Sequence, residues 1–175
     1  PRDGTDTDGL IKKADVALYC SKEAGRGTWN FFDPKMEQAA AARRQLALDL
    51  AGAIDNNEME VCFPPLVSTE DLRITCCEAL VRWNHPVRGA VKPSEFIPIA
   101  EETGIINDIG RHVMEEACRW ATTWPQDTRV AVNVSALQFY GDVMAMVNTS
   151  LKKSGLDPAR LEIEITESLF LQASE

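Results

Sequence analysis

The sequence lacks any long apolar run. No stretch of about 18 uncharged apolar residues occurs, which is the length that a membrane-spanning helix needs. Its first residues, 1–4, carry neither the basic nor the apolar region of a signal peptide. These two absences predict a soluble, intracellular and therefore cytoplasmic protein, with no membrane insertion in this segment.

Nitrogen and sulfur ligands for metals are also scarce. The chain has two histidines and five cysteines, and the cysteines show no C-x-x-C spacing and have no histidine pair nearby. This pattern argues against zinc sites, and the odd number of cysteines argues against a disulfide framework. Buried free thiols are the expectation.

Positive charge is low in most of the chain. Residues 1–46 carry 8 basic and 7 acidic groups, whereas residues 47–175 carry 10 basic and 20 acidic groups. That balance argues against binding to a nucleic acid polymer, which needs basic surface against its phosphates. An excess of carboxylates suits a site for divalent cations, although most of these groups are expected to face solvent.

The pattern along the chain indicates two unequal parts. Residues 1–33 show one helical stripe, at Leu10, Ala14, Ala17 and Leu18, and one short strand at 28–32. One helix and one strand cannot enclose a core, so this segment is expected to belong to a domain whose body lies upstream. An alanine-rich stretch over 34–46 predicts a linker helix, and 47–175 is then the second part.

The second part alternates between strand and helix periods, which predicts an α/β fold. Residues 58–67 and 73–83 read as a hairpin, because two alternating runs flank a turn-like Ser-Thr-Glu-Asp segment. Further helices are expected at 94–102, 109–124 and 142–153, and further strands at 128–134 and 160–167. Strands separated by helices imply parallel pairing.

Three strands of this part offer oxygen ligands. Side chains alternate across a strand, so Glu78 and Arg82 share one face of theirs, roughly 13 Å apart. Asn133 is a polar residue in an otherwise buried run, and Glu164 lies opposite the apolar face of its strand. Oxygen ligands late on successive strands suit Mg²⁺. From spacing alone, solvent-facing glutamates, a capping asparagine and a surface ion pair of Arg82 remain open alternatives.

Four ordered motifs resemble those of EAL domains, which hydrolyse the bacterial second messenger cyclic di-GMP. They are Glu78-Ala79-Leu80 with Val81-Arg82-Trp83, the segment from Gly89 to Gly104, Asn133-Val134-Ser135-Ala136, and Ser154-Gly155-Leu156 followed by Glu162 to Ser168. Upstream, Ala14 to Tyr19 with Lys22 and Gly25-Arg26-Gly27 is similar to the C-terminal end of GGDEF, or diguanylate cyclase, domains.

The resemblance implies a fold and a site. It implies a partial TIM-like (β/α) barrel of the EAL type with an antiparallel first strand, preceded by a GGDEF helix-strand remnant. Glu78, Asn133 and Glu164 would ligate Mg²⁺ or Mn²⁺, Arg82 would hold a phosphate of cyclic di-GMP, and Glu167 would support the loop after its strand. Glu78 and Glu167 would be the catalytic residues. A homodimer through the EAL part is a further expectation.

Two departures from the family pattern bear on activity. The usual Tyr-Gln-Pro is Phe63-Pro64-Pro65 here, which removes a polar side chain near the expected site. The sequence also ends at Glu175, before the family's Asp-Asp pair, catalytic-loop lysine and later glutamate, so this segment by itself is expected to be inactive. For the parent, a metal-dependent phosphodiesterase that opens cyclic di-GMP to pGpG, a non-catalytic EAL receptor for cyclic di-GMP or a regulatory partner, and a structural interaction module remain open.

Overall fold

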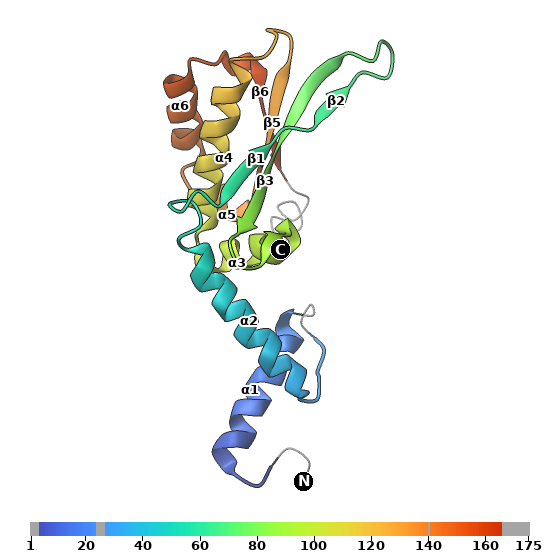
Figure 1. The fold of residues 1–175 in the computed structure, drawn as a ribbon, viewed down its shortest axis with the longest axis vertical. Helices are drawn as coiled ribbons and strands as arrows, with labels where there is room; N and C mark the ends of the chain where they lie inside the picture. The colour runs from blue at the N-terminus through green and yellow to red at the C-terminus, as the bar shows by residue number, and fades with distance from the viewer. Residues whose placement is uncertain (1–3, 24–26, 140, 166–175) are drawn as a thin grey trace. The chain divides into compact units, whose positions relative to one another are not determined.

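The computed structural model describes residues 4–23, 27–139 and 141–165, and the chain divides into two compact units, Pro1–Asp49 and Leu50–Glu175 (Figure 1). In the described ranges, no helix is both long enough and apolar enough to cross a membrane. The division falls three residues after the end of the linker helix expected from the sequence.

The first unit is helical. Helix α1 spans Thr7–Glu23, and helix α2 spans Pro34–Leu50, so the expected linker helix runs four residues further than the sequence indicated. Asp33 caps the N-terminus of α2: its Oδ1 accepts a hydrogen bond from the Lys35 backbone N–H at 2.8 Å. The strand expected at 28–32 is wrong: this segment is irregular, and no other described strand of the unit could pair with its backbone.

The second unit is built on a mixed sheet whose strand order is β1-β3-β5-β6. The long strand β3 (Ile74–His85) pairs antiparallel with three short strands and parallel with β5, which in turn pairs parallel with β6. The remaining strands are β1 (Met59–Cys62), β2 (Pro65–Val67), β4 (Gly89–Val91), β5 (Arg129–Val134) and β6 (Leu161–Ile165). The expected α/β class and parallel pairing are confirmed, with an antiparallel first strand.

The hairpin is confirmed, but its first strand is interrupted. The expected strand over 58–67 divides into β1 and β2, and Phe63-Pro64 lies between them. A proline has no backbone N–H and so cannot donate to the ladder at this point. Its carbonyl still accepts: the Glu78 N–H donates to the Pro64 oxygen at 3.1 Å. The register of β1 against β3 therefore continues past the proline to Leu66, and it shifts only at Val67.

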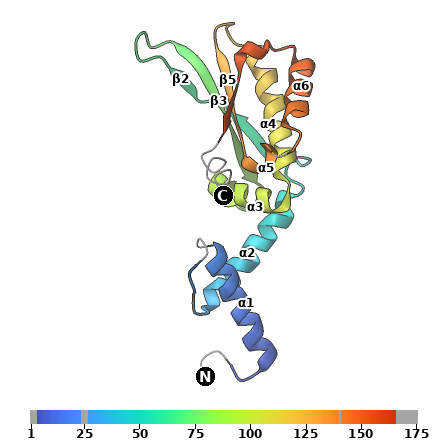
Figure 2. The same ribbon diagram turned by 180° about the vertical axis from the view of Figure 1, so that it is seen from behind.

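Helices cover one face of this sheet. Helix α4 (Ile106–Ala121) lies against β5, with α6 (Val143–Ser154) beside it in both views (Figure 2). The two expected helices at 109–124 and 142–153 are thus confirmed with shifted ends. Helix α3 (Pro93–Thr103) and the single turn α5 (Ala136–Phe139) complete the helices, and η1 (Pro158–Arg160) leads into β6. Glycines with positive φ end α3 and α6, at Gly104 (φ 79°) and Gly155 (φ 74°).

The core lies between the helices and the sheet. Most of its largest fully buried side chains come from β3, α3, α4 and β5, including Trp83, Phe96, Ile109, Met114 and Val132. At one end of this core, Arg160 of η1 links neighbouring segments. Its guanidinium donates to the carbonyls of Ala121 (2.7 Å), Pro125 (3.0 Å) and Thr128 (2.7 Å). These bonds tie the start of β6 to the end of α4 and the start of β5, which fixes the neighbouring strands that carry the candidate site.

Candidate functional site

Three polar side chains from β3, β5 and β6 lie on one face of the sheet. The register pairs Glu78 with Ala131, and Asn133 with Glu164. Because side chains alternate along a strand, Ala131 and Asn133 share a face, and Glu78 and Glu164 share it with them. The Asn133 Nδ2 donates a hydrogen bond to the Glu78 Oε1 at 2.7 Å. The structure thus joins Glu78 and Asn133 by a hydrogen bond and places Glu164 opposite Asn133 on the neighbouring strand.

The core determines which way these side chains point. Val130, Val132 and Val134 are buried, whereas Asn133 between them is exposed. On β3, Cys77 and Ala79 are buried on either side of the half-buried Glu78. The apolar residues of each strand therefore hold the polar ones in place, away from the most tightly packed part of the protein.

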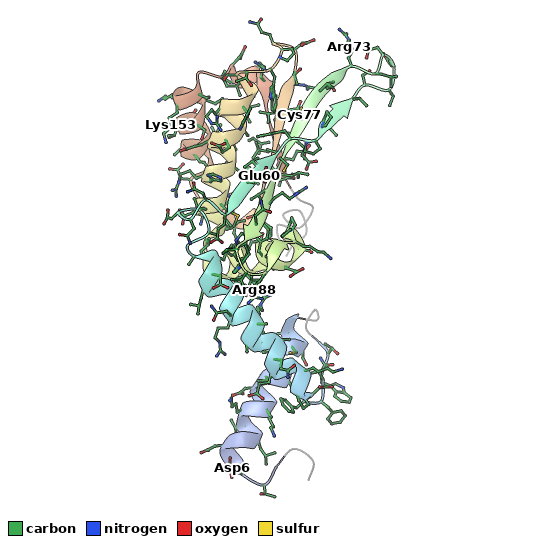
Figure 3. All side chains as sticks on the ribbon, viewed as in Figure 1. Asp6, Glu60, Arg73, Cys77, Arg88 and Lys153 are labelled. Atoms are coloured by element: carbon green, nitrogen blue, oxygen red, sulfur yellow. The ribbon has the colours of Figure 1, made fainter. Side chains whose placement is uncertain are left out.

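Arg82 lies further along β3 than Glu78. It is half-buried, and its Nη1 donates to the Val81 carbonyl at 3.0 Å. Its register partner on β1 is Glu60, which Figure 3 labels. Arg82 and Asn133 both line a cavity of about 220 Å³, to which Glu101 also contributes. A guanidinium and the candidate ligand Asn133 therefore border the same space.

A second set of polar groups lies on the same strands, nearer to the start of each strand. The Arg129 guanidinium forms an ion pair with Glu162, and the Cys76 thiol donates to the other Glu162 oxygen at 3.8 Å. Burial chiefly, and then the Glu162 carboxylate, raises the pKa of the Cys76 thiol, which keeps it a proton donor. These contacts engage Glu162, and the strand register places Glu164, not Glu162, opposite Asn133. Sequence reasoning missed this set, although Cys76 and Arg129 lie one strand repeat before Glu78 and Ala131.

Pro64 lies on the face of the candidate site. The pairings Cys62 with Leu80 and Pro65 with Cys77 place Pro64 opposite Glu78. Phe63 has the reverse orientation and packs on Trp124 of the helix side, with ring centroids 5.3 Å apart. The departure from the Tyr-Gln-Pro pattern thus removes an amide next to Glu78 itself.

Glu167, expected to support a loop after β6, lies outside the described residues. Within residues 4–23, 27–139 and 141–165, no cluster of three or more His, Cys, Asp or Glu side chains is close enough to share a metal ion. The candidate ligands are two carboxylates and one amide, which such a cluster would not include. This oxygen set suits Mg²⁺ or Mn²⁺ better than zinc.

A comparison with known protein families shows to which family the chain belongs. The model of the EAL domain matches residues 47–175. The chain belongs to the EAL domain family. Its EAL part therefore includes the whole sheet described above, with the Glu78-Ala79-Leu80 signature on β3.

Relatives and solved structures agree with this assignment. The chain is 44% identical over 173 residues to an uncharacterized signaling protein of Caulobacter vibrioides, covering 98% of this chain and 21% of the relative. It is 36% identical over 180 residues to the bifunctional diguanylate cyclase/cyclic di-GMP phosphodiesterase MucR of Pseudomonas aeruginosa, covering 100% of this chain and 26% of MucR. The chain thus spans about a quarter of the length of these relatives.

The fold of the EAL part is shared with a solved MucR phosphodiesterase in complex with c-di-GMP. The TM-score is 0.70 at 36% sequence identity, with 74% of this chain and 55% of that chain covered. The α/β fold with its mixed sheet is therefore that of EAL structures.

Proposed function

We propose that this chain is a segment, with part of the EAL domain, of a signalling protein that hydrolyses cyclic di-GMP to the linear dinucleotide pGpG. The observation that carries the proposal is the hydrogen bond between Asn133 and Glu78, with Glu164 opposite Asn133 on the next strand. MucR, named as a cyclic di-GMP phosphodiesterase, supports it at 36% identity. The cofactor would be Mg²⁺ or Mn²⁺.

Glu78, Asn133 and Glu164 would hold the divalent ion. The donor set fits: the amide of Asn133 gives its N–H to Glu78, which leaves the amide oxygen as the ligand atom. When bound, the ion would make a hydroxide available near neutral pH and stabilise the leaving oxygen. The contribution of the chain is to hold two carboxylates and one amide on neighbouring strands before the ligand arrives.

Arg82 would bind a phosphate of the dinucleotide. A guanidinium offers paired N–H donors to phosphate oxygens, and it keeps its charge at any physiological pH. That Arg82 lines the same cavity as Asn133, one of the proposed ligands, supports this role. Glu167 would support the following loop, as the resemblance to EAL domains implies.

The domain plan proposed for the parent has three parts. Residues 1–33 would be the C-terminal tail of a GGDEF domain, 34–46 a linker helix, and 47–175 the N-terminal half of an EAL domain whose strands continue a (β/α) barrel. The helix α1 supports the first part only in its helical portion. We propose a cytoplasmic protein that does not bind nucleic acid polymers and that can form homodimers through its EAL part.

A second candidate function is that of a non-catalytic EAL receptor for cyclic di-GMP or a regulatory partner. Pro64 favours it, because the family pattern has a glutamine amide at this point and the structure puts Pro64 directly opposite Glu78. A receptor would keep Arg82 and the cavity but would not turn over its ligand.

Incubating cyclic di-GMP with the full-length protein and Mn²⁺ separates these candidates. We expect pGpG to accumulate, as followed by chromatography, and to stop accumulating when a chelator removes the ion. We expect the isolated 175-residue chain to show no turnover, because its three ligands form one ion position and in-line displacement is best stabilised by two ions. Binding without product by the full-length protein would favour the receptor, and turnover by the isolated chain would contradict the ligand count.

Replacing Arg82 by alanine in the full-length protein should weaken cyclic di-GMP binding by about 1 to 3 kcal/mol, the usual contribution of a hydrogen bond to a charged group. Affinity for Mg²⁺ should stay nearly unchanged, because the hydrogen bond that Arg82 makes among the described residues goes to the Val81 carbonyl and not to a proposed ligand. Calorimetry with each ligand measures both effects.

Arg73→Ala is the matched control, since Arg73 is an exposed guanidinium at the far end of the hairpin (Figure 3), ion-paired with Asp71 at 2.6 Å. It should alter neither affinity. Equal losses of metal and nucleotide binding in Arg82→Ala would make Arg82 a structural residue instead.

A further inference from the structure

Gly110 is an unexpected residue in the middle of α4. It has ordinary helical geometry, and a glycine in a helix interior costs about 1 kcal/mol relative to alanine. A Cβ at this position would lie 1.7 Å from Nε2 and 2.9 Å from Cδ of the Gln138 side chain. The absent side chain therefore provides the space that Gln138 occupies against α4.

Gln138 closes the turn that follows β5. Its side chain is buried, with 4% exposed, and its Oε1 accepts a hydrogen bond from the Ser135 backbone N–H at 3.0 Å. The Ser135 hydroxyl has no partner in the described part of the chain, so it does not hold this turn. The Gln138 amide holds it instead, through the backbone N–H of Ser135, which lies two residues after Asn133.

We propose that Gln138, held in place by Gly110, is a positioning residue for the Asn133 amide. The inference rests on the proposed function, because it concerns Asn133 as a metal ligand. The Asn133 Nδ2 donates to Glu78, which leaves the amide oxygen for the ion. Gln138 fixes the backbone at Ser135, two residues further on, and would thereby fix the end of β5 from which the Asn133 side chain projects. Replacing a residue that orients a metal ligand typically weakens metal binding by about 10- to 100-fold.

The first experiment measures Mn²⁺ affinity of the full-length protein by electron paramagnetic resonance. Gln138→Met keeps the length of the side chain but has no amide oxygen, and we expect about tenfold weaker binding or more. Gln138→Glu keeps an oxygen for the Ser135 N–H in either protonation state and should restore most of the affinity. Cys118→Ala, a buried substitution elsewhere on α4, is the control and should bind Mn²⁺ as the wild type does.

The second experiment uses thermal unfolding to test whether Gln138 needs the space that Gly110 leaves. Gly110→Ala should lower the Tm of the wild type, because the new Cβ collides with Gln138. In the Gln138→Ala background the collision is gone, and Gly110→Ala should then leave the Tm unchanged or raise it, since alanine is the better helix former.

Four outcomes decide the proposal. Weaker Mn²⁺ binding in Gln138→Met, rescued by Gln138→Glu, supports it, and so does a loss of Tm from Gly110→Ala that is absent or reversed in the Gln138→Ala background. Unchanged Mn²⁺ affinity in a folded Gln138→Met protein would overturn the positioning role. An equal loss of Tm from Gly110→Ala in both backgrounds would show that Gln138 does not depend on the space at Gly110. No Mn²⁺ binding by the wild type would refute the proposed function, while the thermal cycle still reports on Gly110 and Gln138.

Discussion

Glu78→Gln in the full-length protein should lower kcat for cyclic di-GMP hydrolysis by at least about 10³-fold, as expected when one member of a cooperative catalytic set is removed. The substitution exchanges one carboxylate oxygen for an amide nitrogen and removes the negative charge from the proposed ion. The fold should be unaffected, because a glutamine oxygen can still accept the 2.7 Å hydrogen bond from Asn133 Nδ2. Product chromatography over time measures the rate.

The control for this variant is Glu70→Gln. Glu70 is an exposed residue in the turn before β3, and only its backbone N–H makes a described hydrogen bond, to the Ser68 hydroxyl. The Glu70→Gln protein should hydrolyse cyclic di-GMP at the wild-type rate. If Glu78→Gln retained more than about a tenth of the wild-type rate, Glu78 would not be a ligand of the catalytic ion.

Trp83→Ala should destabilise the EAL part by about 3 to 5 kcal/mol, the range for removing a large buried ring. Trp83 is fully buried on β3, five residues after Glu78. Its ring packs edge-on against Phe96 at 5.7 Å between centroids, and its Nε1 donates to the Glu58 carboxylate at 2.9 Å. The free energy of unfolding, measured in urea, reports the effect.

A second variant separates the ring from its hydrogen bond. Trp83→Phe keeps an aromatic ring against Phe96 but leaves Glu58 without its donor, so it should cost less than Trp83→Ala. Glu58→Gln keeps an acceptor oxygen and should cost least. Equal losses in Trp83→Ala and Trp83→Phe would show that the hydrogen bond, and not the packing of the ring, stabilises this strand.

Local periodicity predicted most of the EAL fold. The hairpin and the two amphipathic helices were predictable because alternation and 3.6-residue spacing are local properties of the chain. The three-residue strand β4 (Gly89–Val91) was not, because it is defined only by its pairing with the end of β3. The error at 28–32 has the same cause: Trp29 and Phe31 suit a strand, but the described part of that unit provides no partner strand.

The candidate site was predictable in its face but not in its pairing. Alternation showed that Glu78, Asn133 and Glu164 could face one way, but only the strand register places Asn133 beside Glu164 instead of Glu162. The contact between Gly110 and Gln138 joins a helix to a turn 28 residues later, and no local pattern reveals such an approach. Contacts between elements are set by tertiary packing, which spacing along one chain does not encode.

Anomalous diffraction from crystals of the full-length protein grown with Mn²⁺ tests the central claim most directly. The account predicts a manganese peak within coordination distance of oxygens from Glu78, Asn133 and Glu164, and its loss in crystals of Glu78→Gln. A manganese peak bound elsewhere, with these three side chains making no contact to it at concentrations that support hydrolysis, would contradict the account.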